Sequence, residues 1–247
     1  MSLFYEHHFR LNGLDIDGHG MCKASALLNP LQDAATLAAE AGGFHREMLM
    51  ERYGAFWMLA RSWYRLDRPL RFEDQLTVRT WHRGDRGAMM YRDYDIYADG
   101  QLVGESVSGW VLASLEGHKL MRLSSVTELA GTGGGELCKT MTLSKLHCPE
   151  ELVQVERRPM RYSDSDLNGH VNNTRYADFA CDAVEMDRLE EDRFLASMQI
   201  GYLAECRPGE QLDIQSGGQE DQRYVRGLDE SGKSRFEAAL FFGKAVP

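Results

Sequence analysis

The chain has 247 residues and a formal net charge of -10. This length accommodates one large domain or two small ones, and either can bury a core without disulfides. The negative charge disfavours nucleic-acid binding, and no apolar run approaches the roughly 20 residues needed to span a bilayer. The five cysteines are odd in number and form no CxxC pair. The first residues also lack a signal-peptide pattern, so we expect a cytoplasmic protein.

The first half of the chain predicts one helix followed by several long antiparallel strands. A strand is expected between Met1 and about Gly20, and Ala24–Gly43 is dense in alanine and leucine and ends at paired glycines, as helices do. Aromatic and β-branched runs broken by turn signals then predict strands at Phe56–Leu66, Gln75–His82, Met89–Ala98 and Leu102–Leu115.

The second half predicts the same order of elements. A strand-like segment at Glu156–Tyr162 precedes a helix from about Asn173 to Met186. Further strands are expected at Ser197–Ala204, Gln211–Gln215, Gln222–Leu228 and Arg235–Gly243. Three short matches in the same order indicate a duplication. They pair Asp15–His19 with Asp166–His170, Arg71–Leu76 with Arg207–Leu212, and Asp99–Glu105 with Ser231–Glu237.

A glycine-rich stretch, Gly131–Gly135, lies between the two halves. Its composition is typical of a flexible linker, and it lacks the Lys-Ser/Thr pair of a phosphate-binding P-loop. We therefore predict an α+β protein with an N-terminal domain at residues 1–128, a linker at 129–150 and a C-terminal domain at 151–247. In each domain a helix wrapped by a curved antiparallel sheet leaves an open edge, which pairing with a second copy covers.

Polar side chains crowd the segment from Arg161 to Asp182, which opens onto the second predicted helix. Helix capping by Asn172 or Asn173 explains part of this composition. The functional interpretation is that backbone amides near residues 170–172 form an oxyanion site for a carbonyl group.

Three side chains of the same segment have the chemistry to act on such a carbonyl: Asp166, Asn168 and His170. A carboxylate can act as nucleophile or base, an imidazole can orient it or carry a proton, and an amide can hold water without adding charge.

The first repeat lacks this complete set. Aligned by residue identity, it keeps Asp15 and His19 but has Asp17 in place of Asn168. Downstream, apolar residues stand opposite a carboxylate and a thiol: Pro69 and Leu70 face Glu205 and Cys206 in the alignment. The comparison predicts that the chemistry resides in the second repeat.

These residues resemble the acyl-acyl carrier protein thioesterase family of plants and bacteria. The resemblance rests on Asp166–Asn173 and Tyr202–Cys206, and in the first half on LLNPLQDAA, the strand around Trp57 and RPLRFEDQLTVRTW. It implies a tandem hotdog fold, each hotdog being a long helix wrapped by a curved antiparallel sheet. It also implies hydrolysis of fatty acyl-[acyl carrier protein] thioesters to free fatty acid in fatty acid biosynthesis, with the acyl chain held by the N-terminal hotdog.

The resemblance places the hydrolytic residues at Asp166, Asn168, His170, Glu205 and Cys206. Two mechanisms follow from it. Either Cys206 attacks with His170 as its base, or Asp166 acts on the carbonyl while Glu205 activates water. Consecutive strand residues point to opposite faces, so Glu205 and Cys206 are not expected to share one site. Cysteine is among the most buried residue types, whereas a carboxylate near a core has a functional or paired reason to be there, so we favour Glu205.

The middle of the first repeat is rich in arginine. The residues are Arg61, Arg65, Arg68, Arg71, Arg79, Arg83, Arg86 and Arg92. A basic surface suits docking of the acidic acyl carrier protein. The alternative is that the arginines pair with the nearby acids Asp67, Glu73, Asp74 and Asp85.

Large apolar side chains in the same half are candidates for an acyl pocket or for plain core: Trp57, Met58, Trp63, Met89, Met90 and Trp110. The remaining histidines show no metal-ligand spacing, so we expect neither a metal nor an organic cofactor.

Other functions of the same fold stay open. An acyl-CoA thioesterase would bind a nucleotide instead of docking a carrier protein. A hotdog dehydratase or hydratase also uses a carboxylate and a histidine, but the added asparagines and Glu205 argue against it. A non-catalytic acyl-binding protein would not need the polar set. Chain-length preference is not readable from the sequence, and the fused pair can act alone or as a homodimer.

Overall fold

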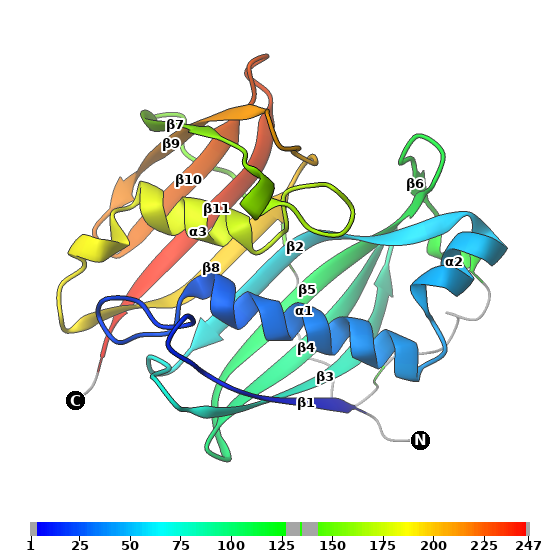
Figure 1. Ribbon diagram of the computed structural model, residues 1–247, viewed down its shortest axis with the longest axis horizontal. Helices are drawn as coiled ribbons and strands as arrows, with labels where there is room; N and C mark the ends of the chain where they lie inside the picture. The colour runs from blue at the N-terminus through cyan, green and yellow to red at the C-terminus, as the bar shows by residue number, and fades with distance from the viewer. Residues whose placement is uncertain (1–3, 127–133, 135–142, 246–247) are drawn as a thin grey trace. The chain divides into compact units, whose positions relative to one another are not determined.

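The computed structural model describes residues 4–126, 134 and 143–245 (Figure 1). Most of the predicted linker, residues 129–133 and 135–142, therefore lies outside the described residues. The chain forms two compact units. The first comprises Met1–Arg10, Pro30–Ser62 and Gln75–Leu143, and the second comprises Leu11–Asn29, Trp63–Asp74 and Ser144–Pro247.

The first unit contains an antiparallel sheet, two helices and a short 3-10 turn. Its strands lie in the order β1-β3-β4-β5-β2, with β6 paired to β5. Their bounds are β1 Tyr5–Arg10, β2 Ala55–Leu66, β3 Gln75–Arg86, β4 Met89–Ala98, β5 Gln101–Ser114 and β6 Leu120–Met121; the helices are α1 Ala24–Ala41 and α2 Arg46–Tyr53, and the 3-10 turn is η1 Leu123–Ser125. The last four residues of β2 and the first six of α1 belong to the second unit.

Periodic apolar positions hold the helix against the sheet in this unit. Helix α1 buries Leu31, Ala34 and Ala35, the spacing that places side chains on one helix face. On β3, Leu76 and Val78 are fully buried, as every second residue of a half-buried strand should be. Figure 1 shows α1 lying across β3, β4 and β5.

The second unit repeats this design. Its strands lie in the order β7-β9-β10-β11-β8, which matches β1-β3-β4-β5-β2 position by position. The bounds are β7 Val153–Pro159, η4 Tyr162–Asp164, α3 Arg175–Ala183, η5 Met186–Arg188, β8 Arg193–Tyr202, β9 Gln211–Gln219, β10 Gln222–Leu228 and β11 Ser234–Lys244. The duplicated strand order confirms the repeat and the α+β class that the sequence predicts.

Aromatic side chains of helix α3 pack against the sheet of the second unit. The ring of Tyr176 lies 5.0 Å from that of Phe236 on β11 and 5.8 Å from that of Phe179. Gly227 on β10 faces the same core, and a Cβ added there would meet the Phe236 ring at 2.4 Å. The backbone of β10 therefore approaches the aromatic cluster more closely than any side chain would allow.

Two helical predictions needed correction. Helix α2 was not expected, because the paired glycines were interpreted as the end of helical structure. It begins three residues after them and ends at Tyr53, and it is followed by Gly54, whose left-handed φ of 57° is common just after a helix. The second predicted helix is shorter than Asn173–Met186. It begins at Arg175 and ends at Ala183, and a 3-10 turn covers Met186–Arg188.

Candidate active site

The candidate site is built around a tight turn between β7 and α3. The amide of Asp166 donates to the carbonyl of His170 at 2.9 Å, and the amide of Gly169 donates to the carbonyl of Asp166 at 3.0 Å. The Asp166 carboxylate accepts the amide of Asn168 at 2.8 Å. Gly169 has a φ of 73°, a conformation that glycine adopts without strain. The turn sequence therefore fixes the direction in which His170 leaves the loop.

A buried carboxylate fastens this turn to the helix that follows. The side chain of Asp164 accepts the amide of Arg161 at 2.7 Å and pairs with Arg175 at 3.3 Å. Its carbonyl accepts the amide of Asn172 at 2.8 Å. Asp164 therefore anchors both ends of the loop.

The turn meets the chain just after β8 and brings two predicted residues together. The amide of Val171 donates to the carbonyl of Cys206 at 2.8 Å. This contact places the His170 Nε2 atom 3.3 Å from the Glu205 Oε2 atom, and the exposed fractions of the two side chains are 16% and 28%. An imidazole and a carboxylate at hydrogen-bond distance, both reachable from solvent, can exchange a proton with a bound water.

Arg235 on β11 holds the backbone of this pair. Its Nη1 donates to the carbonyl of Glu205 at 2.8 Å, and its Nε donates to the Asp229 carboxylate at 2.8 Å. Asp229 also accepts hydrogen bonds from Ser231 and from the amide of Lys233, and these hold the pKa of its carboxyl at about 2. The sequence carries no motif for Arg235, because its role depends on the pairing of β11 with β8.

Cys206 is buried, unlike the adjacent Glu205. Its exposed fraction is 0%, and burial raises the pKa of its thiol. The thiol lies against the hydroxyl of Tyr176, and burial also raises the pKa of that hydroxyl. A neutral, enclosed thiol is a poor nucleophile, because the thiolate is the reactive form. The contrast in exposure between Glu205 and Cys206 agrees with the alternation of side chains along an extended chain.

The other two predicted residues lie in the turn itself. Asp166 is partly buried and Asn168 is exposed. One oxygen of Asp166 already accepts the amide of Asn168, so this carboxylate shapes the turn as well as facing solvent.

The predicted oxyanion site at residues 170–172 is wrong for two of its amides. The amide of Val171 donates to the carbonyl of Cys206, and that of Asn172 donates to the carbonyl of Asp164. Both are internal backbone hydrogen bonds that hold the loop, so neither amide is available to a substrate oxygen. The Asn172 side chain accepts hydrogen bonds from the amide and the hydroxyl of Thr174 at 2.9 and 2.8 Å. It therefore holds the residue that directly precedes α3.

The structure also corrects the alignment of the two repeats. In the first repeat the amide of Asp17 donates to the carbonyl of Met21, the amide of Gly20 donates to the carbonyl of Asp17, and the Asp17 carboxylate accepts the amide of His19. This is the hydrogen-bond pattern of the second turn, shifted by two residues from the match by identity. The equivalent pairs are Asp17 with Asp166, His19 with Asn168, Gly20 with Gly169, and Met21 with His170.

The corrected alignment isolates the chemical difference between the repeats. Arg71 and Arg207 remain equivalent, because each donates its amide to an acid three residues later, Asp74 and Glu210. In the first repeat, Met21 thus stands at the position of His170, and Pro69 at that of Glu205. Two residues without acid–base chemistry replace the imidazole and the carboxylate, so only the second repeat carries the pair.

Half of the predicted basic run is neutralised locally. Arg68 pairs with Asp74 at 3.0 Å, Arg79 pairs with Glu6 at 2.7 Å, and Arg65 lies 3.8 Å from Asp67. Arg83 pairs with the buried Asp93. For these four arginines the structure favours ion pairing over docking.

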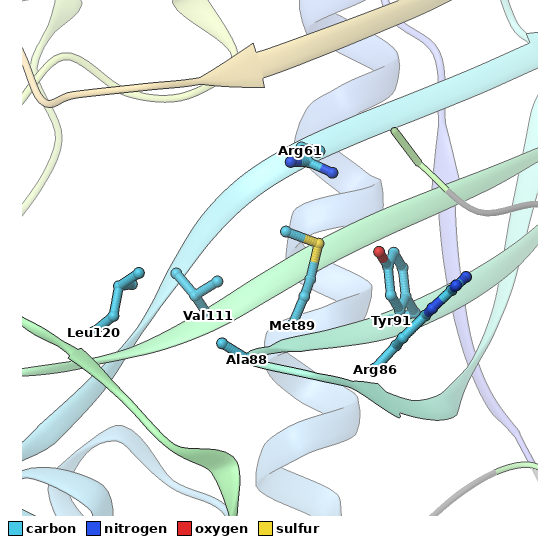
Figure 2. Close-up of a pocket in the computed structure, with 7 residues that line it drawn as sticks. All are labelled: Arg61, Arg86, Ala88, Met89, Tyr91, Val111 and Leu120. Carbon is cyan, nitrogen blue, oxygen red and sulfur yellow. The ribbon is translucent and has the colours of Figure 1, made fainter. Parts of the chain in front are cut away.

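Three of the predicted acyl-pocket residues lie in two different environments of the first unit. Trp57 and Met90 pack against a core cluster that contains Leu49 and Leu112, so they are core side chains. Met89 instead lines an open cavity (Figure 2).

No group of three or more His, Cys, Asp or Glu side chains within residues 4–126, 134 and 143–245 is arranged to hold a metal ion. Across the same part of the chain, no helix combines the length and the apolar character required to cross a membrane.

Comparison with known proteins matches both halves to one family. The model for the acyl-ACP thioesterase N-terminal domain matches residues 2–128, and the model for the C-terminal domain matches residues 149–239. The chain belongs to the acyl-ACP thioesterase family. The candidate pair of His170 and Glu205 lies within the stretch matched by the C-terminal domain.

Curated members of the family are identical to this chain at about one fifth of the aligned residues. An oleoyl-acyl carrier protein thioesterase of Coriandrum sativum is 21% identical over 239 residues, which cover 90% of this chain and 64% of that protein. A dodecanoyl-[acyl-carrier-protein] hydrolase of Cinnamomum camphora is 23% identical over 224 residues, covering 83% and 57%. The chain thus spans about three fifths of the length of the relatives it matches.

Solved structures share the fold. The acyl-ACP thioesterase from Bacteroides thetaiotaomicron superposes with a TM-score of 0.89 at 22% identity, covering 98% of this chain and 100% of that one. The 12:0-ACP thioesterase from Umbellularia californica gives 0.82 at 18% identity, covering 99% and 97%. These likenesses establish the double hotdog fold that the sequence resemblance implied.

Proposed function

We propose that this protein hydrolyses fatty acyl-[acyl carrier protein] thioesters and releases free fatty acid, as a step of fatty acid biosynthesis. The observation that carries the proposal is the contact between His170 and Glu205 at 3.3 Å, in the repeat whose sequence matches the family's C-terminal domain. The names of the curated relatives add support, because they describe oleoyl and dodecanoyl carrier-protein substrates.

In the proposed mechanism Glu205 accepts a proton from a water molecule as the water oxygen attacks the thioester carbonyl carbon. The carbon–sulfur bond then breaks, and the departing thiolate of the carrier takes up the proton through His170, whose imidazole lies within hydrogen-bond distance of Glu205. The products are a fatty acid and the free carrier thiol. Asp166 is proposed to act on the carbonyl, and Asn168 to hold water or the carboxylate beside it.

The thiol route through Cys206 is less consistent with the structure. A nucleophile must reach the carbonyl carbon, and Cys206 has no exposed surface. Its raised pKa also keeps the thiolate fraction small near neutral pH, so attack would require both an opening of the loop and a loss of the proton.

The other parts of the proposal concern organisation. The N-terminal hotdog at residues 1–128 is proposed to receive the acyl chain, residues 129–150 to link the halves, and residues 151–247 to carry the chemistry. Acyl carrier protein is the proposed partner. A cytoplasmic location and the choice between monomer and homodimer stay predictions.

The test measures hydrolysis of a series of acyl carrier protein thioesters and of the matching acyl-CoA esters. Glu205→Gln and His170→Gln should each lower kcat at least a hundredfold, in the range expected for loss of a general base. Asp166→Asn should also lower kcat. Cys206→Ala should leave kcat near the wild-type value, and so should the control Glu191→Gln, which changes an exposed carboxylate.

The outcome also separates the alternatives. Faster turnover of the CoA esters would replace the carrier protein by a nucleotide-bearing substrate of the same site. Loss of activity only in Cys206→Ala would restore the thiol route. If no thioester is cleaved by the wild type, the proposed function fails.

A further inference from the structure

Arg175, the first residue of α3, joins the turn at residues 166–170 (the His170 turn) to a second carboxylate. Its Nη2 and Nε atoms lie 3.3 and 3.4 Å from the Oδ1 atom of Asp164, the buried residue that anchors the turn. Its Nη1 atom lies 2.5 Å from the Oδ2 atom of Asp178, one helical turn further along α3. A planar guanidinium with donors in fixed directions suits such a bridge between two carboxylates. The proposed mechanism uses neither Arg175 nor Asp178.

Asp178 in turn contacts the start of the long helix α1. Its carboxylate accepts a hydrogen bond from the hydroxyl of Ser25, the buried second residue of α1. Burial raises the pKa of the Asp178 carboxyl, and the hydrogen bond from Ser25 and the charge of Arg175 act in the opposite direction. A carboxylate beside the first turn of a helix is also favoured by the helix dipole. A continuous line of contacts inside the second unit thus runs from α1 to the His170 turn, through Ser25, Asp178, Arg175 and Asp164.

This line of contacts ends on the backbone that carries His170. The carbonyl of Asp164 accepts the amide of Asn172, two residues after His170, at 2.8 Å. The Asp164 carboxylate also accepts the amide of Arg161 at 2.7 Å, so this one residue holds the chain on both sides of His170. Arg175 holds the Asp164 carboxylate. A shift of that carboxylate is therefore passed to the backbone of His170, whose imidazole belongs to the candidate catalytic pair.

The first repeat closes an equivalent turn with the same backbone hydrogen bonds. The carbonyl of Asp15 accepts the amide of Lys23 at 2.8 Å, and the Asp15 carboxylate accepts the amide of Asn12 at 2.8 Å. Asp15 therefore corresponds to Asp164, and Lys23 corresponds to Asn172.

The two repeats differ in the side chains behind the turn. Three and six residues after the shared hydrogen bond, the first repeat has Ala26 and Asn29 where the second has Arg175 and Asp178. The turn of the first repeat therefore closes without the bridge between two carboxylates. A bridge that served only to close the turn would be needed in both repeats. It occurs in the repeat that also carries the imidazole and the carboxylate of the candidate site.

We propose that Arg175 and Asp178 are positioning residues of the hydrolysis, an inference that rests on the proposed function. They tie the His170 turn to the first turn of α1 and so keep the imidazole beside Glu205. Both act through Asp164 rather than on the substrate. Small displacements of a reacting group reduce the rate strongly, whereas substrate binding does not depend on the same precision. Loss of either side chain should therefore lower kcat and leave KM nearly unchanged.

Steady-state hydrolysis of one acyl carrier protein thioester tests this role. Arg175→Ala and Asp178→Asn introduce the residues that the first repeat has at these positions, so the turn should still close. Arg175→Ala should lower kcat about tenfold with KM changed less than about twofold. Asp178→Asn should have a smaller effect, because Arg175 keeps its contacts with Asp164. Arg175→Lys, which keeps the charge but loses the fork of donors, should recover part of the loss.

A double variant tests whether the two residues act together. Once Arg175 is absent, Asp178 has no contact through which to influence the turn, so Arg175→Ala combined with Asp178→Asn should match Arg175→Ala alone. The matched control is Arg188→Ala, which removes another ion pair between residues three positions apart, with Glu185. The control should keep the kcat of the wild type.

Hydrogen exchange followed by NMR measures the position of the turn without turnover. In Arg175→Ala the amide of Asn172 should exchange at least about tenfold faster than in the wild type, while the amides of β10 should exchange at the wild-type rate. Equal acceleration in β10 would show a loss of global stability only and would overturn the inference.

Three further results would overturn it: wild-type kcat in Arg175→Ala, an equal fall of kcat in Arg188→Ala, or unchanged exchange at Asn172. Failure of the proposed function is distinguishable from these. In that case the wild type cleaves no thioester, while the exchange rate of the Asn172 amide still decides whether Arg175 holds the His170 turn.

Discussion

Replacing Arg235 by methionine tests whether Glu205 is positioned from the neighbouring strand. The change removes two hydrogen bonds, one to the Glu205 carbonyl and one to the Asp229 carboxylate, both at 2.8 Å. Hydrogen bonds of charged groups contribute about 1.5–3 kcal/mol each when shielded from water. The side chains of Arg235 and Asp229 are 24% and 16% exposed, so solvent screening reduces this, and we expect unfolding to become easier by about 2 kcal/mol in total.

The catalytic effect should exceed what a stability loss alone produces. Without Arg235 the backbone at Glu205 loses its lateral support, and small misplacements of reacting groups have large costs in rate. We expect kcat to fall about tenfold with KM changed less than twofold, because the variant touches no predicted substrate-binding side chain. Arg235→Lys, which keeps the charge and one donor, should recover part of the loss.

Urea denaturation and steady-state hydrolysis of one acyl carrier protein thioester measure the two effects. The matched control is Arg188→Met, which removes an ion pair to Glu185 on an arginine that is 71% exposed; it should cost less than about 0.5 kcal/mol and leave kcat unchanged. A variant that loses the expected stability while keeping wild-type kcat would refute the positioning role. Arg235 would then be a structural residue only.

Three further predictions concern packing, titration and the thiol. Gly227→Ala should destabilise the protein by about 1–3 kcal/mol, because the new Cβ would lie 2.4 Å from the Phe236 ring, whereas in Gly201→Ala the nearest atom is 4.0 Å away; equal unfolding midpoints for the two variants would contradict this close approach. Asp229 has a pKa of about 2 in the folded protein against an ordinary value of 3.8, so it contributes stability above pH about 4 that is lost as the pH falls through about 2. Asp229→Asn should therefore lose stability at neutral pH and show a smaller decline on acidification, measured as the urea midpoint against pH; parallel curves for variant and wild type would show that Asp229 is not involved. Native Cys206 should resist iodoacetamide at pH 8, since burial excludes the reagent and raises the thiol pKa, and should react once urea is added; rapid labelling of the folded protein, read by mass spectrometry, would show that the thiol is accessible.

Local pattern predicted most of the secondary structure. The bounds of β4 and β10 were predicted to the residue, because a run of alternating residues between glycine-containing turns leaves little freedom in where a strand begins and ends. Helix α2 was missed, since its sequence Arg46–Tyr53 has almost no apolar periodicity and buries only Leu49. Its helical state depends on packing that a local pattern does not contain.

The two repeats show where sequence comparison reaches its limit. Matching Asp15–His19 to Asp166–His170 by residue identity recovered the duplication but placed the turn two residues out of register. Equivalent positions are defined by their backbone hydrogen bonds. Identical residue types can occur at positions that are not structurally equivalent. The backbone contacts of Asp17 and Asp166 corrected the alignment and showed that Met21 stands where His170 does.

By itself, the sequence determined the fold class, the duplication, the family resemblance and the set of polar residues from which the site is drawn, because periodicity and short motifs are local properties of the chain. Only the tertiary structure decided which of those residues meet. His170 and Glu205 are brought to 3.3 Å by a backbone hydrogen bond from Val171 to Cys206 and by Arg235, which arrives on β11. The extended chain after β8 leaves Glu205 partly exposed and buries Cys206. These outcomes depend on strand pairing over long sequence separations, and no local pattern encodes that pairing.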